Sequence, residues 1–428
     1  MGNDLVRAFV FFMTSQHYAW PGCCSIKNVV MKRIYTGKGY IGLPALVGIW
    51  SVSALTSLPG LAVSPISEKL LTVFPSATEL DIQMLTTLPS LLIIPFVLLA
   101  GYLSSRIGHI KLLYIGLSLF LLSGVLYFFC TGMAQLIVVS GLLGIGAGII
   151  VPLSTSLVSR FFEGEERTRQ YGYVSAITNI SLVVATALTG WLADIQWRLP
   201  FLVYLLPFFS IILVPAIRRG ESTLRSSVDE NTQVEDNAID YGTLSKYMLY
   251  YLLITYLVMA VSINLPFLLG SLGYDSGVSG IVTSLFFLAM MLPGLFLNRI
   301  LAVLKGWVWV FSMLLIALGL ADIWLNGSLF FIIIGCAAMG VGYGIAQPYI
   351  YDVVSRLATG RSVTYALALV MVMNYVAIVV APFILEFLQD TTGLKSGSSP
   401  FLINAVVALT ALVFMLWLVF IKKRRVSL

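Results

Sequence analysis

The sequence has few charged residues, few histidines and few cysteines, and each shortage excludes a class of protein. Only 10% of its 428 residues are charged, whereas a soluble domain carries about a quarter. The two histidines, His17 and His109, lie outside the long apolar runs, and neither belongs to an H-E-x-x-H metal motif. The four cysteines have no metal-ligand spacing, and the sequence has neither a G-x-S-x-G turn nor paired intramembrane aspartates. We therefore expect no enzyme, no metal and no cofactor.

Hydrophobic residues make up 59% of the chain, and the mean hydropathy is +0.97. Runs of about 20 apolar residues, the length that crosses a hydrocarbon core of about 30 Å, occur twelve times. One long polar stretch separates six runs from the other six. The sequence thus predicts an all-α membrane protein with an N-terminal segment at 1–40, a six-helix bundle at 41–217, a linker at 218–245, a second six-helix bundle at 246–421 and a basic tail at 422–428.

The distribution of positive charge predicts the orientation of these spans. The formal net charge is +6, but no basic patch is interleaved with aromatic residues, so nucleic acid is not an expected partner. Of the lysines and arginines, only Lys69, Arg198 and Lys395 fall on one side of the predicted spans, and all the others fall on the opposite side. Because positive charge resists translocation, we expect cytoplasmic termini and a plasma (inner) membrane location. Residues 1–30 match no span and precede a basic start at Met31, so we interpret them as a candidate start-site artefact.

The two predicted halves repeat one another in sequence. Three glycines, a proline and a Ser-Arg pair recur in the fourth and tenth runs, each displaced by the same number of residues. Internal repeats of this kind are typical of secondary transporters. Rocking of helices and static close packing both explain the glycines. The paired positions are Gly144, Gly146, Gly148, Pro152 and Ser159-Arg160 in the first half, and Gly340, Gly342, Gly344, Pro348 and Ser355-Arg356 in the second.

Three motifs in the first half carry a family resemblance. The loop after the second run reads Gly101-Tyr-Leu-Ser-Ser105-Arg106-Ile-Gly108-His-Ile-Lys111, Arg160-Phe-Phe162 is followed by Glu166-Arg167, and Trp197-Arg198-x-x-Phe201 opens the sixth run. Over residues 31–425 the chain resembles the major facilitator superfamily, in particular its twelve-helix drug/proton antiporters. The loop is similar to the family signature G-x-L-x-D-R-x-G-R-[KR], with serine in place of the aspartate. The chain departs from the antiporters at Ser140, where they carry a helix-4 arginine, and at Ala185–Gly190, which keeps only the last glycine of their helix-5 motif G-P-x-x-G-G.

The resemblance implies two six-helix bundles related by a pseudo-twofold axis along the membrane normal, with a midplane cavity between them. It also implies a cytoplasmic gate, for which the candidates are Gly101, Arg106, Gly108 and Arg299. The expected function is proton-coupled efflux of hydrophobic or amphipathic small molecules by a monomer in the lipid bilayer. The alternative is proton-coupled or facilitated uptake of a specific small metabolite. A transport-inactive membrane sensor is a third class, but the stretch at 218–245 is too short and polar to be a sensor domain.

Polar and aromatic side chains at the middle of the spans are the candidates for binding the transported molecule. An unpaired amide in lipid costs free energy, so such groups face a cavity or a neighbouring helix. Packing is the alternative role for each of them. The candidates are Trp50, Asn179, Tyr256, Tyr343, Gln347, Asn374 and Tyr375.

Carboxylates within the spans are the candidates for carrying protons, because burial in a membrane raises the pKa of an acid towards neutral pH. Glu386 has no obvious partner on its own helix, and Asp81 lies near the outer start of the second span, where helix capping also explains it. We expect Asp352 to form a structural pair with Arg356, one turn further along the same helix.

Overall fold

The computed structural model describes residues 33–59, 70, 73–75, 79–227, 239–274, 276–358, 362–393 and 398–426. The interpretation of residues 1–30 lies outside this part of the chain. Within it, eleven helices are long and apolar enough to cross a membrane, and a shorter apolar helix precedes them. The prediction of an all-α membrane protein is confirmed.

The first half begins with a short antiparallel β-hairpin, in which Ile34 of β1 (Arg33–Tyr35) lies opposite Ile41 of β2 (Tyr40–Gly42). The hairpin leads directly into α3 (Leu43–Leu55), whose first turn holds Pro44, a residue that suits this position because it lacks an N–H group. The remaining elements of this half are α5 (Glu79–Ile107), α6 (His109–Phe129), α7 (Met133–Phe161), α8 (Gly164–Ile195), the 3-10 segment η3 (Leu199–Leu205) and α9 (Pro207–Ser227).

The second half begins at Asp240, whose carboxylate accepts a hydrogen bond from the backbone N–H of Thr243 at 3.0 Å and caps α10. Hydrogen bonds from the side chain and backbone of Thr243 lower the pKa of Asp240. The elements are α10 (Tyr241–Ser271), α11 (Ser276–Leu295), the short α12 (Leu297–Leu304), the 3-10 segment η4 (Lys305–Trp307), α13 (Val308–Leu325), α14 (Leu329–Leu357), α15 (Ser362–Thr392) and α16 (Ser399–Val426).

Several boundaries differ from those that hydropathy predicts. Of the first predicted span, 41–63, the described residues form a helix only over Leu43–Leu55. Helix α9 continues past residue 217 to Ser227, and α10 begins at Tyr241, before residue 246. A helix does not end where the bilayer ends, because its backbone hydrogen bonds are internal and tolerate water as well as lipid. The hairpin and α12 were not predicted, because each is far shorter than a span.

The repeated glycines pack helices together within each half. A Cβ atom on Gly144 would lie 2.6 Å from the Cα of Pro89 on α5, and one on Gly146 would lie 2.7 Å from the backbone N of Phe120 on α6. In the second half, a Cβ on Gly344 would overlap the backbone of Met290 on α11, and one on Gly342 would lie 2.8 Å from the Ser312 carbonyl of α13. The glycine-rich segments of α7 and α14 therefore make the same pair of close contacts, α7 with α5 and α6, and α14 with α11 and α13. Close packing within a half explains these glycines.

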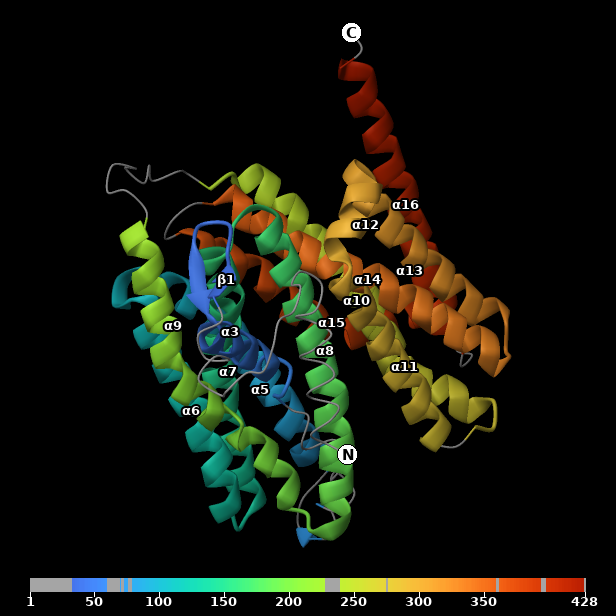
Figure 1. The fold of residues 1–428 in the computed structure, drawn as a ribbon. Helices are drawn as coiled ribbons and strands as arrows, with labels where there is room; N and C mark the ends of the chain where they lie inside the picture. Colours follow the sequence, from blue (N-terminus) through green and yellow to red (C-terminus); the bar gives the residue numbers. More distant parts are fainter. Residues whose placement is uncertain are drawn as a thin grey trace, which may run out of the picture.

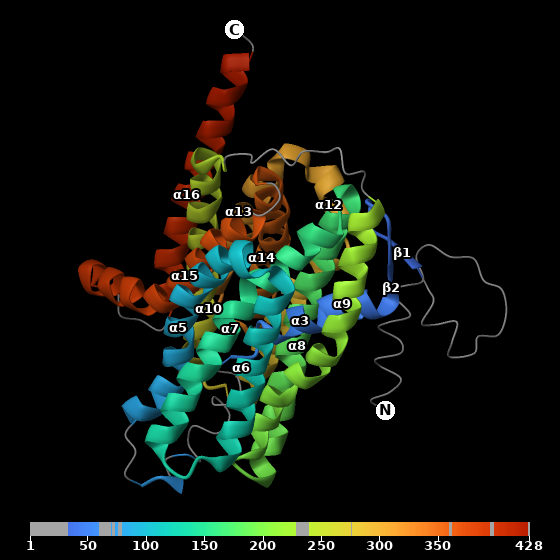
Figure 2. The same cartoon turned by 90° about the vertical axis from the view of Figure 1, so that its left-hand side faces the viewer.

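The helices form two groups, each with its own hydrophobic core (Figure 1). In Figure 1, α14 and the start of α8 lie close together near the top, whereas the lower ends of α8 and α11 lie apart. The ends of α5, α7 and α14 carry Arg106, Arg160 and Arg356, and the beginnings of α10 and α12 carry Lys246 and Arg299. We call the side of the molecule that these five residues mark the basic end. Figure 2 shows the hairpin at the side of the molecule, beside α3 and α9.

Candidate functional site

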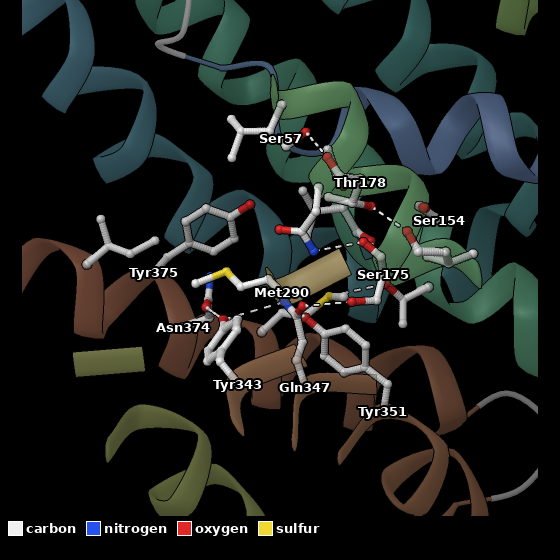
Figure 3. Close-up of a pocket in the computed structure, with 18 of the residues that line it drawn as sticks. Ser57, Ser154, Ser175, Thr178, Met290, Tyr343, Gln347, Tyr351, Asn374 and Tyr375 are labelled. Atoms are coloured by element: carbon white, nitrogen blue, oxygen red, sulfur yellow. Dashed lines mark hydrogen bonds between the residues drawn. The ribbon is translucent and has the colours of Figure 1, made fainter. Parts of the chain in front are cut away.

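A cavity of about 360 Å³ lies between the two halves, within the size range of small-molecule sites. Figure 3 shows residues of both halves around it. The first half contributes the residues that follow α3 and parts of α5, α7 and α8, and the second half contributes parts of α10, α11, α14 and α15. The cavity extends to Pro59, beyond the end of α3 that lies away from the basic end.

Five of the seven predicted binding residues line this cavity: Asn179, Tyr343, Gln347, Asn374 and Tyr375. Their function in binding stays a prediction, but the structure brings them together from three helices (Figure 3).

The other two predicted binding residues, Trp50 and Tyr256, lie elsewhere. The indole N–H of Trp50 donates to Oε1 of Gln170 at 3.1 Å, and its ring packs edge-on against Tyr173. Tyr256 is only 5% exposed, and its hydroxyl has no hydrogen-bond partner among the described residues. The contacts of Trp50 and the burial of Tyr256 fit helix packing.

A hydrogen-bonded network fixes the polar side chains on the second-half wall. Gln347 donates from Nε2 to the Tyr251 hydroxyl at 3.0 Å, and that hydroxyl lies 2.6 Å from the hydroxyl of Tyr351. Asn374 accepts two hydrogen bonds at Oδ1, from Tyr343 at 3.2 Å and from Thr255 at 3.1 Å. Each amide is therefore held in one orientation before any ligand arrives, which reduces the entropy lost on binding.

The first-half wall is made of smaller polar groups on α8 and in the segment that follows α3. Asn179 donates to the carbonyl of Ser175 at 2.9 Å, and Ser57 donates to the carbonyl of Thr178 at 3.2 Å. The hydroxyl of Ser175 also donates a hydrogen bond to Oε1 of Gln347, on the other half, at 3.4 Å. This bond joins the two halves at the cavity wall.

Three methionines and Tyr351 also line the cavity and were missed in the sequence. Methionine side chains are flexible and polarizable, so they adapt to ligands of different shape. Helical spacing was the available signal, because Tyr343, Gln347 and Tyr351 recur every four residues along α14 and so share one face. The methionines are Met259, Met290 and Met371.

The described residues that line the cavity include no aspartate, glutamate, lysine, arginine or histidine. The wall instead offers tyrosine rings and hydroxyls, amides, serine and threonine hydroxyls and methionine sulfurs. A site of this kind provides apolar contact and neutral hydrogen bonds. It has no fixed charge to compensate an ionic ligand, for which desolvation would be costly.

A charged cluster joins the two halves at the basic end, outside the cavity. Asp352 on α14 accepts from Nε of Arg167 on α8 at 3.2 Å and from the Thr168 hydroxyl at 2.8 Å. It also pairs with Arg356 of its own helix at 2.5 Å, which confirms the predicted pair, and Arg356 donates to Thr168 at 3.0 Å. The Asp352 side chain is only 3% exposed. We call these four residues the latch.

Close backbone packing reinforces the latch. A Cβ atom on Gly172 of α8 would overlap the carbonyl oxygen of Gly294 on α11, and one on Gly101 of α5 would lie 2.7 Å from the Cβ of Ala368 on α15. Asn298 of α12 donates to the Glu165 carbonyl at 3.0 Å. Each contact joins the first half to the second, so the structure is closed at its basic end.

Comparison with known proteins decides the family. The Major Facilitator Superfamily model matches the chain twice, over residues 45–246 and 247–427. The chain belongs to the major facilitator superfamily. It is a multi-pass membrane protein of that superfamily, as its apolar helices and internal repeat predicted.

Two curated relatives match short parts of this facilitator. The multidrug transporter protein MdtP of Bacillus subtilis is 32% identical over 124 residues, which are 28% of this chain and 22% of the relative. The quinolone resistance protein NorA of Staphylococcus aureus is 27% identical over 114 residues, 27% of this chain and 29% of the relative. The chain therefore spans less than a third of the length of these relatives in either match.

Two solved structures share the fold of this facilitator. The proton:xylose symporter XylE aligns with a TM-score of 0.69 at 14% identity, covering 87% of this chain and 94% of XylE. The human organic anion transporter MFSD10 aligns with a TM-score of 0.65 at 16% identity, covering 87% of this chain and 96% of MFSD10.

The predicted gate residues lie at the basic end, but the described ion pair that crosses the halves there is made by other residues. Arg106 is exposed, and its guanidinium lies 4.7 Å from the ring centre of Tyr102 on its own helix. Gly108 forms the turn into α6 with φ of +95°, a conformation that favours glycine. Arg299 is exposed on α12. Arg167 makes the described ion pair between the halves, and Gly101 packs against Ala368 of the other half. The gate function of the four candidates stays a prediction.

The predicted proton-carrying acids lie away from the cavity. Glu386 is exposed on α15 between Phe383 and Phe387, which are also exposed, and Asp81 is partly exposed near the start of α5. Neither lines the cavity as the structure describes it. His109, expected outside the spans, is instead the buried first residue of α6, where its Nε2 lies 3.2 Å from the Leu153 carbonyl. It is buried because only Gly108 separates α5 from α6, and α6 packs against α7 from its first turn.

Proposed function

We propose that this transporter exports uncharged or lipophilic small molecules by alternating access, with the central cavity as the binding site. The observation that carries the proposal is the cavity wall, which combines aromatic, methionine and neutral polar groups without a fixed charge. Such a wall suits molecules with an apolar body and a few neutral hydrogen-bonding groups. The printed names of MdtP and NorA, which denote drug transport and drug resistance, agree with this substrate class.

We further propose that the basic end faces the cytoplasm and that the protein acts as a monomer in the plasma membrane. The excess of lysine and arginine at this end supports the orientation, because positive charge is retained on the cytoplasmic side. The described conformation is then closed towards the cytoplasm. Export requires the latch to open, so that the cavity can load from the inner side, and to close again before release.

Proton exchange is the proposed energy source, with Glu386 and Asp81 as the candidate acids. Fixed charge is absent from the described cavity wall, so coupling must act through acids outside the binding site. These acids would then change the balance between the two conformations without contacting the cargo.

Flux in reconstituted vesicles tests the proposal. Purified protein is placed in proteoliposomes loaded with a neutral, a cationic or an anionic dye, and efflux is followed with and without an imposed pH gradient. We expect gradient-driven export of the neutral dye to be fastest. Gradient-driven accumulation of one hydrophilic metabolite without dye export would contradict the proposal and favour specific uptake.

A further inference from the structure

We infer that the N-terminal hairpin positions the latch, so that Thr36 and Gly37 determine how readily the basic end opens. The inference rests on the proposed transport function, because a latch regulates a protein only when its two halves move. Thr36 and Gly37 act here as positioning residues, since neither touches the second half in the described contacts.

The hairpin is firmly attached to the first half. Its side chains alternate, so that Thr36 and Ile41 are buried at 0% and 2% exposure, whereas Tyr35 and Tyr40 are exposed and pack on each other. Ile41 lies against α9 beside Gly220. The hairpin therefore moves with the first half and presents its tip, residues 36–39, in a fixed direction.

The tip contacts the turn between α7 and α8. The carbonyl of Thr36 accepts a hydrogen bond from the backbone N–H of Glu163 at 2.9 Å. Glu163 is the N-cap of α8, where backbone N–H groups have no partner within the helix. The tip is itself held closed by two bonds from Thr36 to the carbonyl of Gly39, at 2.9 Å from the backbone and 3.1 Å from the side chain.

Gly37 fits the tip to the turn for two reasons. Its φ is +85°, which a side chain disfavours, and a Cβ atom at this position would lie 2.6 Å from the carbonyl oxygen of Glu163. Lys38 follows beside Glu163, and burial lowers the pKa of its ammonium group. The hairpin tip and the α7–α8 turn are thus matched in shape over a short contact.

The same stretch of α8 carries the contacts to the second half. Within five residues of Glu163, the Glu165 carbonyl accepts from Asn298, and Arg167 and Thr168 bind Asp352. The first turn of a helix frays most easily because its N–H groups lack internal partners. Without the hairpin contact we expect this turn to loosen, so that Arg167 and Thr168 are held less well and the closed state is favoured less.

A matched pair of glycine variants tests the inference by a distance rather than by transport. Gly37→Ala places a methyl group against Glu163, whereas Gly42→Ala, in the same hairpin, meets only the ring of Pro44 at 3.6 Å. Spin labels are attached at Lys111→Cys and Ala302→Cys, two exposed positions of the basic end on opposite halves, in a chain without its native cysteines. Pulsed EPR in lipid nanodiscs then measures the populations of the closed and open distances.

We expect Gly37→Ala to raise the open-to-closed ratio about fivefold, the effect of losing one hydrogen bond, and Gly42→Ala to leave it unchanged. The double variant Tyr35→Ala/Tyr40→Ala loosens the hairpin without touching Glu163, so we expect it also to raise the open-to-closed ratio. It replaces Gly37→Ala should that variant fail to insert into the membrane. The combination of Gly37→Ala with Arg167→Ala should be less than additive, because both act through one segment of α8.

Two results overturn the inference in different ways. If Arg167→Ala increases the distance between the two spin labels and the hairpin variants do not, the latch exists but the hairpin does not position it. If neither Arg167→Ala nor the hairpin variants change the distance, the basic end does not open, and the proposed transport cycle fails together with the inference.

Discussion

Asp352 and Arg167 form an ion pair at 3.2 Å although they are 185 residues apart in the chain and belong to different halves of the molecule. Asp352 is almost fully buried, with a 3% exposed side chain, and Arg167 is 14% exposed. An ion pair with this little water around it holds the halves together only in the conformation that brings its two helices side by side. The pair is thus a marker of the closed state.

Replacing Asp352 with asparagine should favour opening of the basic end. The substitution leaves Arg167 and Arg356 close together without a counter-charge, and we expect a loss of about 1–3 kcal/mol from the closed state. A cysteine at Ala368, which packs against Gly101 across the halves, should then react faster with a thiol reagent. The control is Glu221→Gln, which removes the Arg160 pair at the same end but within the first half. Equal reactivity in the Asp352 variant and the parent would refute the role of the latch.

Gly172→Ala should weaken the closed state through sterics alone. Its methyl group would overlap the Gly294 carbonyl on the other half, so α8 and α11 must separate. Gly190→Ala, further along the same helix, has no neighbour within 4 Å among the described atoms, and should be neutral or slightly stabilising because alanine favours helix. Dye flux and thiol accessibility at Ala368 compare the two variants, and identical behaviour would show that this contact does not limit the cycle.

Gln347→Leu should reduce binding of a neutral dye about three- to tenfold, because the central hydrogen-bond donor of the cavity wall is lost. Fluorescence titration of the purified protein measures the Kd. Trp50→Phe is the matched control, since Trp50 was also predicted to bind substrate but contacts Gln170 and Tyr173 away from the cavity. Should Trp50→Phe weaken binding as much as Gln347→Leu, the binding site is not the cavity described here.

Glu386→Gln or Asp81→Gln should uncouple flux from the pH gradient while leaving dye binding measurable. Glutamine cannot lose a proton, and it is nearly isosteric with glutamate and slightly larger than aspartate, so titration is removed with little change in packing. Flux is measured with and without a gradient in each variant, alongside equilibrium dye binding. Full gradient-driven flux in both variants would rule out these acids and make facilitated diffusion or another coupling ion the better explanation.

The sequence predicted the spans and the repeat well, because both can be recognised from residues that are close together in the chain. Hydropathy over 20 residues locates a helix in lipid whatever that helix touches, and the glycines around Gly146 and Gly342 showed the duplication directly. The candidate binding residues were predicted in part. Gln347 and Asn374 were found because amides are rare in spans, whereas the cavity methionines resembled ordinary core residues.

Two predictions depended on the direction in which a side chain points, and the sequence does not contain that direction. Trp50 was a candidate because it is polar, aromatic and at mid-depth, yet its indole turns towards Gln170. Arg106 was a candidate for the cytoplasmic gate, but its guanidinium lies over Tyr102 of its own helix. A shift of one residue along a helix turns a side chain by about 100°, so depth in the membrane says little about the neighbour that it meets.

By itself, then, the sequence determined that this protein spans a membrane many times, that its halves are duplicates and that its family is one of transporters. Only the tertiary structure decided which polar groups share a cavity, that Asp352 meets Arg167 as well as Arg356, and that the hairpin supports the turn before α8. The physical reason is the range of the interactions. The free energy of transferring an apolar helix into lipid is a sum over the residues of that helix. A cavity or an ion pair between the halves, in contrast, exists only when helices distant in the chain pack at one particular rotation and height.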